Sequence, residues 1–151
     1  MRLWHKDLVP YLPREQLVAQ WRELSAIAGN IKTKGAPNHI LVNKVMDYPF
    51  DHFITYAAAV RQEMTYRGYR TMDSVWNKIT SITNNDYNIL PLNEIFNKWH
   101  NDRYLLQCIL NLEEKYDCGS VSQKDWNKIK RVFINNLEIN LDSIWDNVVG
   151  D

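Results

Sequence analysis

The chain has 151 residues, 45% hydrophobic and 24% charged, with six Trp, eight Tyr and four Phe but five Gly and five Pro. This composition excludes a fibrous or a disordered chain, fits a single domain, and favours packed helices over a turn-rich β-sandwich or barrel. Eighteen Lys and Arg balance eighteen Asp and Glu, and this neutrality, taken alone, argues against a nucleic-acid partner.

A long amphipathic helix is predicted between Pro13 and Gly35. Its apolar residues recur at spacings of three and four and are Leu17, Trp21, Leu24, Ala28 and Ile31. The following segment, residues 38–48, is short and precedes Pro49, which restricts the residue before it to extended or turn geometry. We therefore expect a brief helix or an irregular stretch there.

A second helix is predicted from about Phe50 to Arg67, with Gly68 as its C-terminal stop. Its inward face should consist of Phe53, Ala57, Val60 and Met64. Residues 71–91 contain Asn and Pro turn formers, so a short helix over 74–82 followed by a loop is expected.

In the second half of the chain, the spacing of apolar residues predicts a third long helix followed by shorter ones. The core stripe of the third helix should include Ile95, Trp99, Leu105 or Leu106, Ile109 and Leu112, with Gly119 beyond its end. Ser122 and Asp125 resemble an N-cap arrangement for a fourth helix. The apolar residues of that helix are Trp126, Ile129, Val132 and Phe133. With a last short helix over 141–149, residues 1–151 should form an all-α, single compact domain of three long helices plus shorter ones.

The sequence predicts neither a membrane span nor a disulfide framework. No stretch approaches the roughly 20 apolar residues of a transmembrane helix, and the N-terminus has no apolar signal segment. Only Cys108 and Cys118 occur, and we expect both to be reduced, structural thiols of an intracellular, cytoplasmic protein. None of the four histidines pairs with a second ligand at helical spacing, so neither a metal nor a cofactor is expected.

The neutral total hides an uneven distribution of charge. Residues 1–70 hold ten basic and six acidic groups, a balance of +4, and residues 71–151 carry −4. The N-terminal half could therefore face a polyanion while the C-terminal half is acidic and solvated. A chance asymmetry is the alternative.

The first predicted helix has an unusual polar face. At 100° per residue, Arg22 lies opposite the apolar stripe beside Ala19 and Ala26, and Glu23 lies about a quarter turn from the apolar centre. Small alanines around an Arg and a Glu make a surface that another molecule could approach closely. An ordinary solvated face is the alternative.

Residues 17–24 read Leu-Val-Ala-Gln-Trp-Arg-Glu-Leu and follow an N-terminus of Met-Arg-Leu-Trp. This pattern resembles the pyrimidine-dimer DNA glycosylase family, the phage endonuclease V type. Weaker similarity is found at Pro37 with Ile40-Leu41, at Arg67-Gly68-Tyr69 and at Leu112-Glu113-Glu114-Lys115. Residues 119–151 have little counterpart apart from Trp126 with Lys128, which faintly resemble a DNA-contacting tail.

The resemblance implies an all-helical repair enzyme that excises one base of an ultraviolet-induced dimer and then cleaves the strand at the abasic sugar, as glycosylase, lyase and endonuclease. The nucleophile would be the N-terminal α-amine, which attacks C1′ and forms a Schiff base. Glu23 would steer protonation and abstract the C2′ proton for β-elimination. Arg2, Arg22 and Lys115 would contact DNA.

An N-terminal amine suits this chemistry. An α-amino group with an ordinary pKa of about 7.7 to 8.0 is partly unprotonated at neutral pH, whereas a lysine near 10.4 is almost fully charged. Because the bulk of Arg2 normally prevents removal of an initiator Met, we expect Met1 to be retained and to supply the amine. A nearby carboxylate can stabilise the imine and relay protons.

The sequence departs from the family at Ser25-Ala26, where a Pro and a DNA-contacting Arg are expected, and at Asn111, where a basic residue is expected. Three lysines near the end of the first helix would then compensate as DNA contacts: Lys32, Lys34 and Lys44. Plain surface lysines are the alternative. His39 either contacts a nucleotide or makes a structural hydrogen bond.

The expected partner is double-stranded DNA carrying a damaged or modified pyrimidine, bound by a monomer encoded by a bacterium or a phage. Two alternatives stay open: a glycosylase for a different modified base, and a non-catalytic helical module that binds DNA or protein. A metal-dependent nuclease is a third and would be inhibited by EDTA.

Overall fold

The computed structural model describes residues 1–134, and this part of the chain is all-α. Its α-helices are α1 (Arg14–Lys34), α2 (Phe50–Tyr66), α3 (Asp73–Thr80), α4 (Asp102–Asp117) and α5 (Gln123–Ile129). Short 3-10 segments are η1 (Lys6–Tyr11), η2 (Asn43–Asp47), η3 (Ser81–Thr83) and η4 (Leu92–Glu94), and a π-helical turn, η5 (Lys130–Ile134), follows α5. The helix expected over 141–149 lies outside the described residues.

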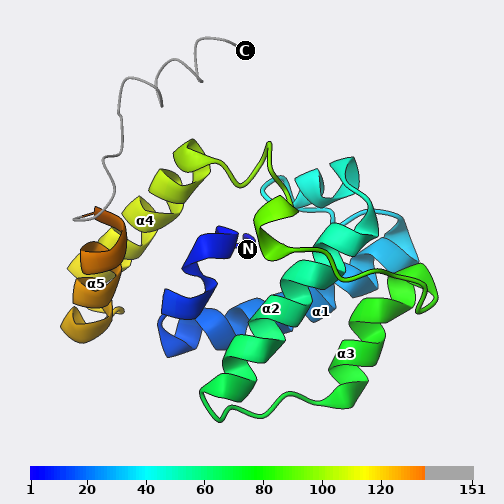
Figure 1. The fold of residues 1–151 in the computed structure, drawn as a ribbon, viewed down its shortest axis with the longest axis horizontal. Coiled ribbons are helices and arrows are strands. Elements are labelled where there is room, and N and C mark those ends of the chain that lie inside the picture. Colours follow the sequence, from blue (N-terminus) through cyan, green and yellow to red (C-terminus); the bar gives the residue numbers. More distant parts are fainter. Residues whose placement is uncertain (135–151) are drawn as a thin grey trace.

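The two N-terminal helices form as predicted. The apolar stripe of α1 is buried, and Gly35 ends the helix with φ 81° as its N–H bonds to the Ile31 carbonyl oxygen at 3.0 Å. Gly68 follows α2 with φ 80°, and the next amide, that of Tyr69, bonds to the Met64 carbonyl oxygen at 2.8 Å. Helix α1 packs against both α2 and α3 (Figure 1).

The third long helix is shorter than predicted. Ile95 and Trp99 are buried, but they lie before the helix, because Phe96 adopts a positive φ of 52° that a right-handed helix cannot contain. Helix α4 begins after Asn101, whose side-chain oxygen accepts from the Tyr104 amide at 2.9 Å. Of the two leucines considered for its core face, Leu105 is the buried one.

The predicted cap of the fourth helix is confirmed, since Ser122 Oγ accepts from the Asp125 amide at 3.1 Å. Trp126 on α5 is buried and stacks on Tyr116 of α4 with ring centroids 5.8 Å apart. It therefore belongs to the core and not to a surface that could stack on bases. Val132, expected on the same apolar face, is half-buried.

The N-terminal segment passes through the middle of the molecule, between α4 and α2 (Figure 1). Leu3 is fully buried, and its carbonyl oxygen accepts from the Tyr104 hydroxyl at 2.6 Å. The Lys6 ammonium is also buried and donates to the Ile95 carbonyl oxygen at 2.6 Å. These contacts fix the start of the chain against helices far away in sequence.

Cys108 is buried, Cys118 is exposed, and both are free thiols. Across residues 1–134, the structure contains no helix with the length and apolar character that crossing a membrane requires.

Candidate active site

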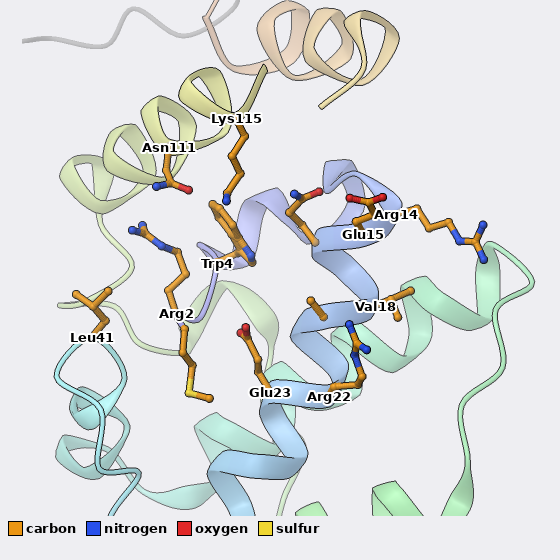
Figure 2. A pocket seen from close by; sticks show the side chains of 13 residues that line it. Arg2, Trp4, Arg14, Glu15, Val18, Arg22, Glu23, Leu41, Asn111 and Lys115 are labelled. Atoms are coloured by element: carbon orange, nitrogen blue, oxygen red, sulfur yellow. The ribbon is translucent and has the colours of Figure 1, made fainter. Parts of the chain in front are cut away.

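A cleft of about 790 Å³ opens where the N-terminal segment, α1 and α4 meet (Figure 2). Its lining consists of Met1, Arg2, Trp4, Arg14, Glu15, Gln16, Val18, Ala19, Arg22, Glu23, Leu41, Asn111 and Lys115. Four of these side chains are cationic and two are acidic, so the cleft is net positive although the whole chain is neutral. The positive sign suits a polyanionic ligand.

Gln20 ties the N-terminal backbone to α1. Its side chain is fully buried; Nε2 donates to the Arg2 carbonyl oxygen at 3.0 Å, and Oε1 accepts from the Trp4 amide at 2.9 Å. The Tyr56 hydroxyl lies 2.6 Å from the Trp4 carbonyl oxygen and 2.9 Å from Gln20 Oε1. Side chains from α1 and α2 thus hold, as a clamp, the backbone of the residues that follow Met1.

Glu23 lies beside this clamp, with Oε2 3.4 Å from Gln20 Nε2. Partial burial raises the pKa of its carboxyl group above the ordinary value. The N-terminal amine, the Arg2 backbone, His39 and Arg22 act in the opposite direction but do not cancel the effect of burial. A partly desolvated carboxylate therefore lies in the same cleft as the N-terminal amine, near enough for that amine to act on it electrostatically.

Arg2 extends toward α4 and away from Glu23 (Figure 2). Its guanidinium carbon lies 5.3 Å from the centroid of the Trp4 ring, and Nη1 lies 3.9 Å from Cys108 Sγ. Trp4 is only 6% exposed, so its indole supports the guanidinium and offers little free face for a base. From α4, Asn111 and Lys115 reach into the same cleft (Figure 2).

Five of the residues named from the sequence line this one cleft: Met1, Arg2, Arg22, Glu23 and Lys115. His39 lies close enough to influence the Glu23 carboxyl group, and its Nδ1 accepts from the Leu41 amide at 3.2 Å. The lysines Lys32, Lys34 and Lys44 are exposed and do not line the cleft. Any contact they make with a ligand would lie outside it.

Gln20 was missed as a site residue, although the sequence contained a signal. It lies three residues after Leu17 and four before Leu24, so it falls on the buried face of α1, where an amide needs hydrogen-bond partners. Tyr56, its partner from α2, had no comparable signal, because aromatic residues are common on apolar faces.

No metal centre accompanies the cleft within residues 1–134, since no three His, Cys, Asp or Glu side chains are grouped to hold an ion there. His5 and His100 are buried in the core and stack with ring centroids 5.1 Å apart. Burial lowers the pKa of both imidazoles, that of His100 to about 2, so they are neutral parts of the interior at neutral pH.

Comparison with known proteins finds a match to one family model. The family model described as pyrimidine dimer DNA glycosylase matches residues 1–77, which include α1, α2 and the cleft residues Met1, Arg2, Arg22 and Glu23. No curated protein and no solved structure matches the chain. Since the matched region covers half of the chain and contains the amine, the Glu23 carboxylate and three of the four cationic side chains of the cleft, the protein belongs to the pyrimidine dimer DNA glycosylase family.

Proposed function

We propose that the protein is a DNA base-excision enzyme that removes a base of a pyrimidine dimer and cleaves the strand at the resulting abasic site. The observation that carries the proposal is the position of the Met1 amine and the Glu23 carboxylate in one positively charged cleft. An amine that forms an imine and a carboxylate that moves protons are the two groups which this reaction requires.

In the first stage, the unprotonated amine of Met1 attacks C1′ of the damaged nucleotide. The C1′–N bond to the base breaks, and the departing base takes up a proton. The sugar ring then opens at the C1′–O4′ bond: O4′ takes up the proton that the attacking nitrogen releases, and a protonated imine remains between Met1 and C1′. Glu23 stabilises this positive charge, because a carboxylate in a partly desolvated cleft interacts more strongly than one in water.

In the second stage, Glu23 takes the C2′ proton, which the adjacent iminium makes acidic. The electron pair forms a C2′–C3′ double bond and expels the 3′ phosphate by β-elimination. Water then hydrolyses the imine and restores the free amine. No metal or redox cofactor takes part in this sequence.

Binding the damaged duplex depends on the cations around the cleft. Arg22 on α1 and Lys115 on α4 border the cleft on different helices and would hold phosphates on either side of the damaged nucleotide. Arg2 would face the sugar-phosphate near C1′. A damaged step stacks weakly, which lowers the free energy needed to bring C1′ to the amine.

Borohydride trapping tests the proposal. The protein is incubated with duplex oligonucleotides that contain a thymine dimer, an abasic site or no lesion, with and without borohydride and in EDTA. We expect a covalent adduct on the dimer and the abasic site alone. Cleavage that EDTA abolishes would assign a metal-dependent nuclease, and excision of another modified pyrimidine instead of the dimer would change the substrate.

The roles of Met1 and Glu23 are tested by variants. An N-terminally acetylated or extended protein should lose the adduct while it keeps its fold, and mass spectrometry should find Met1 at the adduct. If blocking the N-terminus leaves trapping unchanged, the assignment of the Met1 amine as the nucleophile is wrong. Glu23→Gln should abolish strand cleavage, whereas Glu114→Gln, an exposed carboxylate of α4 outside the cleft, should not. A non-catalytic module would show no difference between the two.

A further inference from the structure

Two large apolar side chains stand exposed at the edge of the cleft. Ile40 is 84% exposed and Leu41 is 47% exposed, and both lie in the turn between α1 and η2. Met1, itself 42% exposed, belongs to the same cleft as Leu41. Neighbouring apolar side chains left in water at the mouth of a charged cleft indicate a contact surface.

Hydrogen bonds within the turn hold these side chains outward. Asn38 has a positive φ of 59°, and the His39 amide donates to Asn43 Oδ1 at 3.1 Å. His39 Nδ1 accepts from the Leu41 amide, and Val42, directly after it, is fully buried. These contacts hold the backbone of the turn in the conformation that leaves Ile40 and Leu41 exposed.

The turn lies close to the reacting groups. Leu41 lines the cleft together with Met1 and Glu23, and in Figure 2 Arg2 stands between Leu41 and Glu23. His39 lies close enough to influence the Glu23 carboxyl group, which independently places the turn near it. A ligand that fills the cleft therefore also meets Leu41, and Ile40 is the exposed residue directly before it in the turn.

We propose that Ile40 and Leu41 form an apolar wedge that inserts into the base stack of duplex DNA at the damaged step. This inference rests on the proposed function, since it takes damaged DNA as the ligand of the cleft. Base faces are apolar and phosphates are charged, and the cleft offers both kinds of contact: the apolar Leu41 lies next to Arg2, and Arg22 lies on the other side of Glu23 (Figure 2). Apolar side chains that enter a base step unstack it and kink the duplex, which brings C1′ within reach of a surface amine.

Trapping and fluorescence on two duplexes test the wedge. One duplex has an abasic site opposite 2-aminopurine, a base whose fluorescence rises when it unstacks. The other carries three unpaired bases around the same site, so that no unstacking is needed. The variants are the double change Ile40→Ser with Leu41→Ser, the conservative Ile40→Leu, and a matched control, Ile89→Ser, whose side chain is 56% exposed outside the cleft.

The double variant should trap the paired duplex about tenfold more slowly and the opened duplex within about twofold of wild type, and it should lose the fluorescence rise. Ile89→Ser should behave as wild type, and Ile40→Leu, which keeps an apolar side chain, should keep the fluorescence rise, with all variants giving the same circular dichroism. Equal losses on both duplexes, or no loss on either, would overturn the wedge.

Failure of the proposed function gives a different result. If wild-type protein traps neither duplex, the amine chemistry is wrong, but the fluorescence of the bound duplex still decides the wedge. A rise that the double variant abolishes would support insertion by a non-catalytic binder. The absence of a rise with wild-type protein would refute insertion and assign the exposed pair to another partner.

Discussion

Gln20 donates from Nε2 to the carbonyl oxygen of Arg2 at 3.0 Å, and this bond joins the N-terminal segment to the helix that carries Glu23. The same amide group lies 3.4 Å from Glu23 Oε2. One buried side chain therefore fixes the Arg2 backbone and the carboxylate relative to each other. In the proposed reaction Gln20 would position the reacting groups without touching the substrate, since its side chain has no exposed surface.

Replacing Gln20 with Leu should impair the reaction more than the fold. The change leaves the buried Trp4 amide and Arg2 carbonyl without their partner, at a cost of about 1 to 3 kcal/mol for an unsatisfied buried group. Borohydride trapping on abasic DNA should fall by more than the folded fraction does, with the loss in the chemical step and not in DNA affinity. Gln107→Leu, on the exposed side of α4, is the control. Equal trapping by the two variants would contradict the positioning role.

The pH dependence of cleavage should reflect the environment of Glu23. Burial raises the pKa of this carboxyl group above 4.5, so the carboxylate that takes the C2′ proton is lost at a higher pH than for an exposed glutamate. The acid limb of β-elimination from the preformed imine, measured in a single turnover so that protonation of the free amine does not enter, should therefore have its midpoint above pH 4.5. Gln20→Glu, which places a like charge beside Glu23, should move this midpoint further toward neutral pH. A midpoint at or below 4.5 would argue against Glu23 as the base.

Arg22 should contribute to DNA affinity through phosphate binding. It lines the cleft and is exposed, and a single phosphate contact accounts for about 0.9 in the slope of log K against log salt. Arg22→Gln should lower that slope by about one and weaken binding to damaged and undamaged duplex alike. Titrations with labelled duplex at several salt concentrations measure it. Lys78→Gln, an exposed cation of α3 outside the cleft, should leave the slope unchanged.

Acid should destabilise the protein through His100. Its Nδ1 accepts from the Lys6 amide at 3.0 Å, and burial lowers the pKa of the imidazole to about 2, against about 6.5 in an unfolded chain. The unfolded state therefore binds the proton first, so the stability that neutral His100 provides is complete above pH 6.5 and declines as pH falls toward 2. One such group contributes a slope of up to about 1.4 kcal/mol per pH unit.

Denaturant unfolding between pH 7 and 4 measures this slope. His100→Asn, whose side-chain oxygen can accept the Lys6 amide but does not titrate in this range, should be less stable overall and should lose less stability on acidification. Parallel curves for wild type and His100→Asn would show that another group causes the acid sensitivity.

The sequence alone predicted much of the fold and part of the site. Helical spacing identified the buried face of α1, and Gly35 and Gly68 marked the ends of two helices, because helical period and left-handed caps are local properties of the chain. The same spacing failed at Ile95 and Trp99, which are buried without being helical. Burial in an irregular segment depends on which distant residues pack over it, and a local sequence pattern does not predict those contacts.

On α1, the neighbouring positions of Arg22 and Glu23 follow from the sequence, since residues adjacent along a helix keep a fixed angle between them. Only the tertiary structure decided that Met1 lies beside that face, because the hydrogen bonds from Gln20 and Tyr56 that hold the N-terminal backbone there come from two separate helices. The core packing likewise brought Lys115 of α4 to the cleft and left Lys32 outside it. Contacts between residues distant along the chain depend on how whole helices pack, which the period of a single helix does not specify.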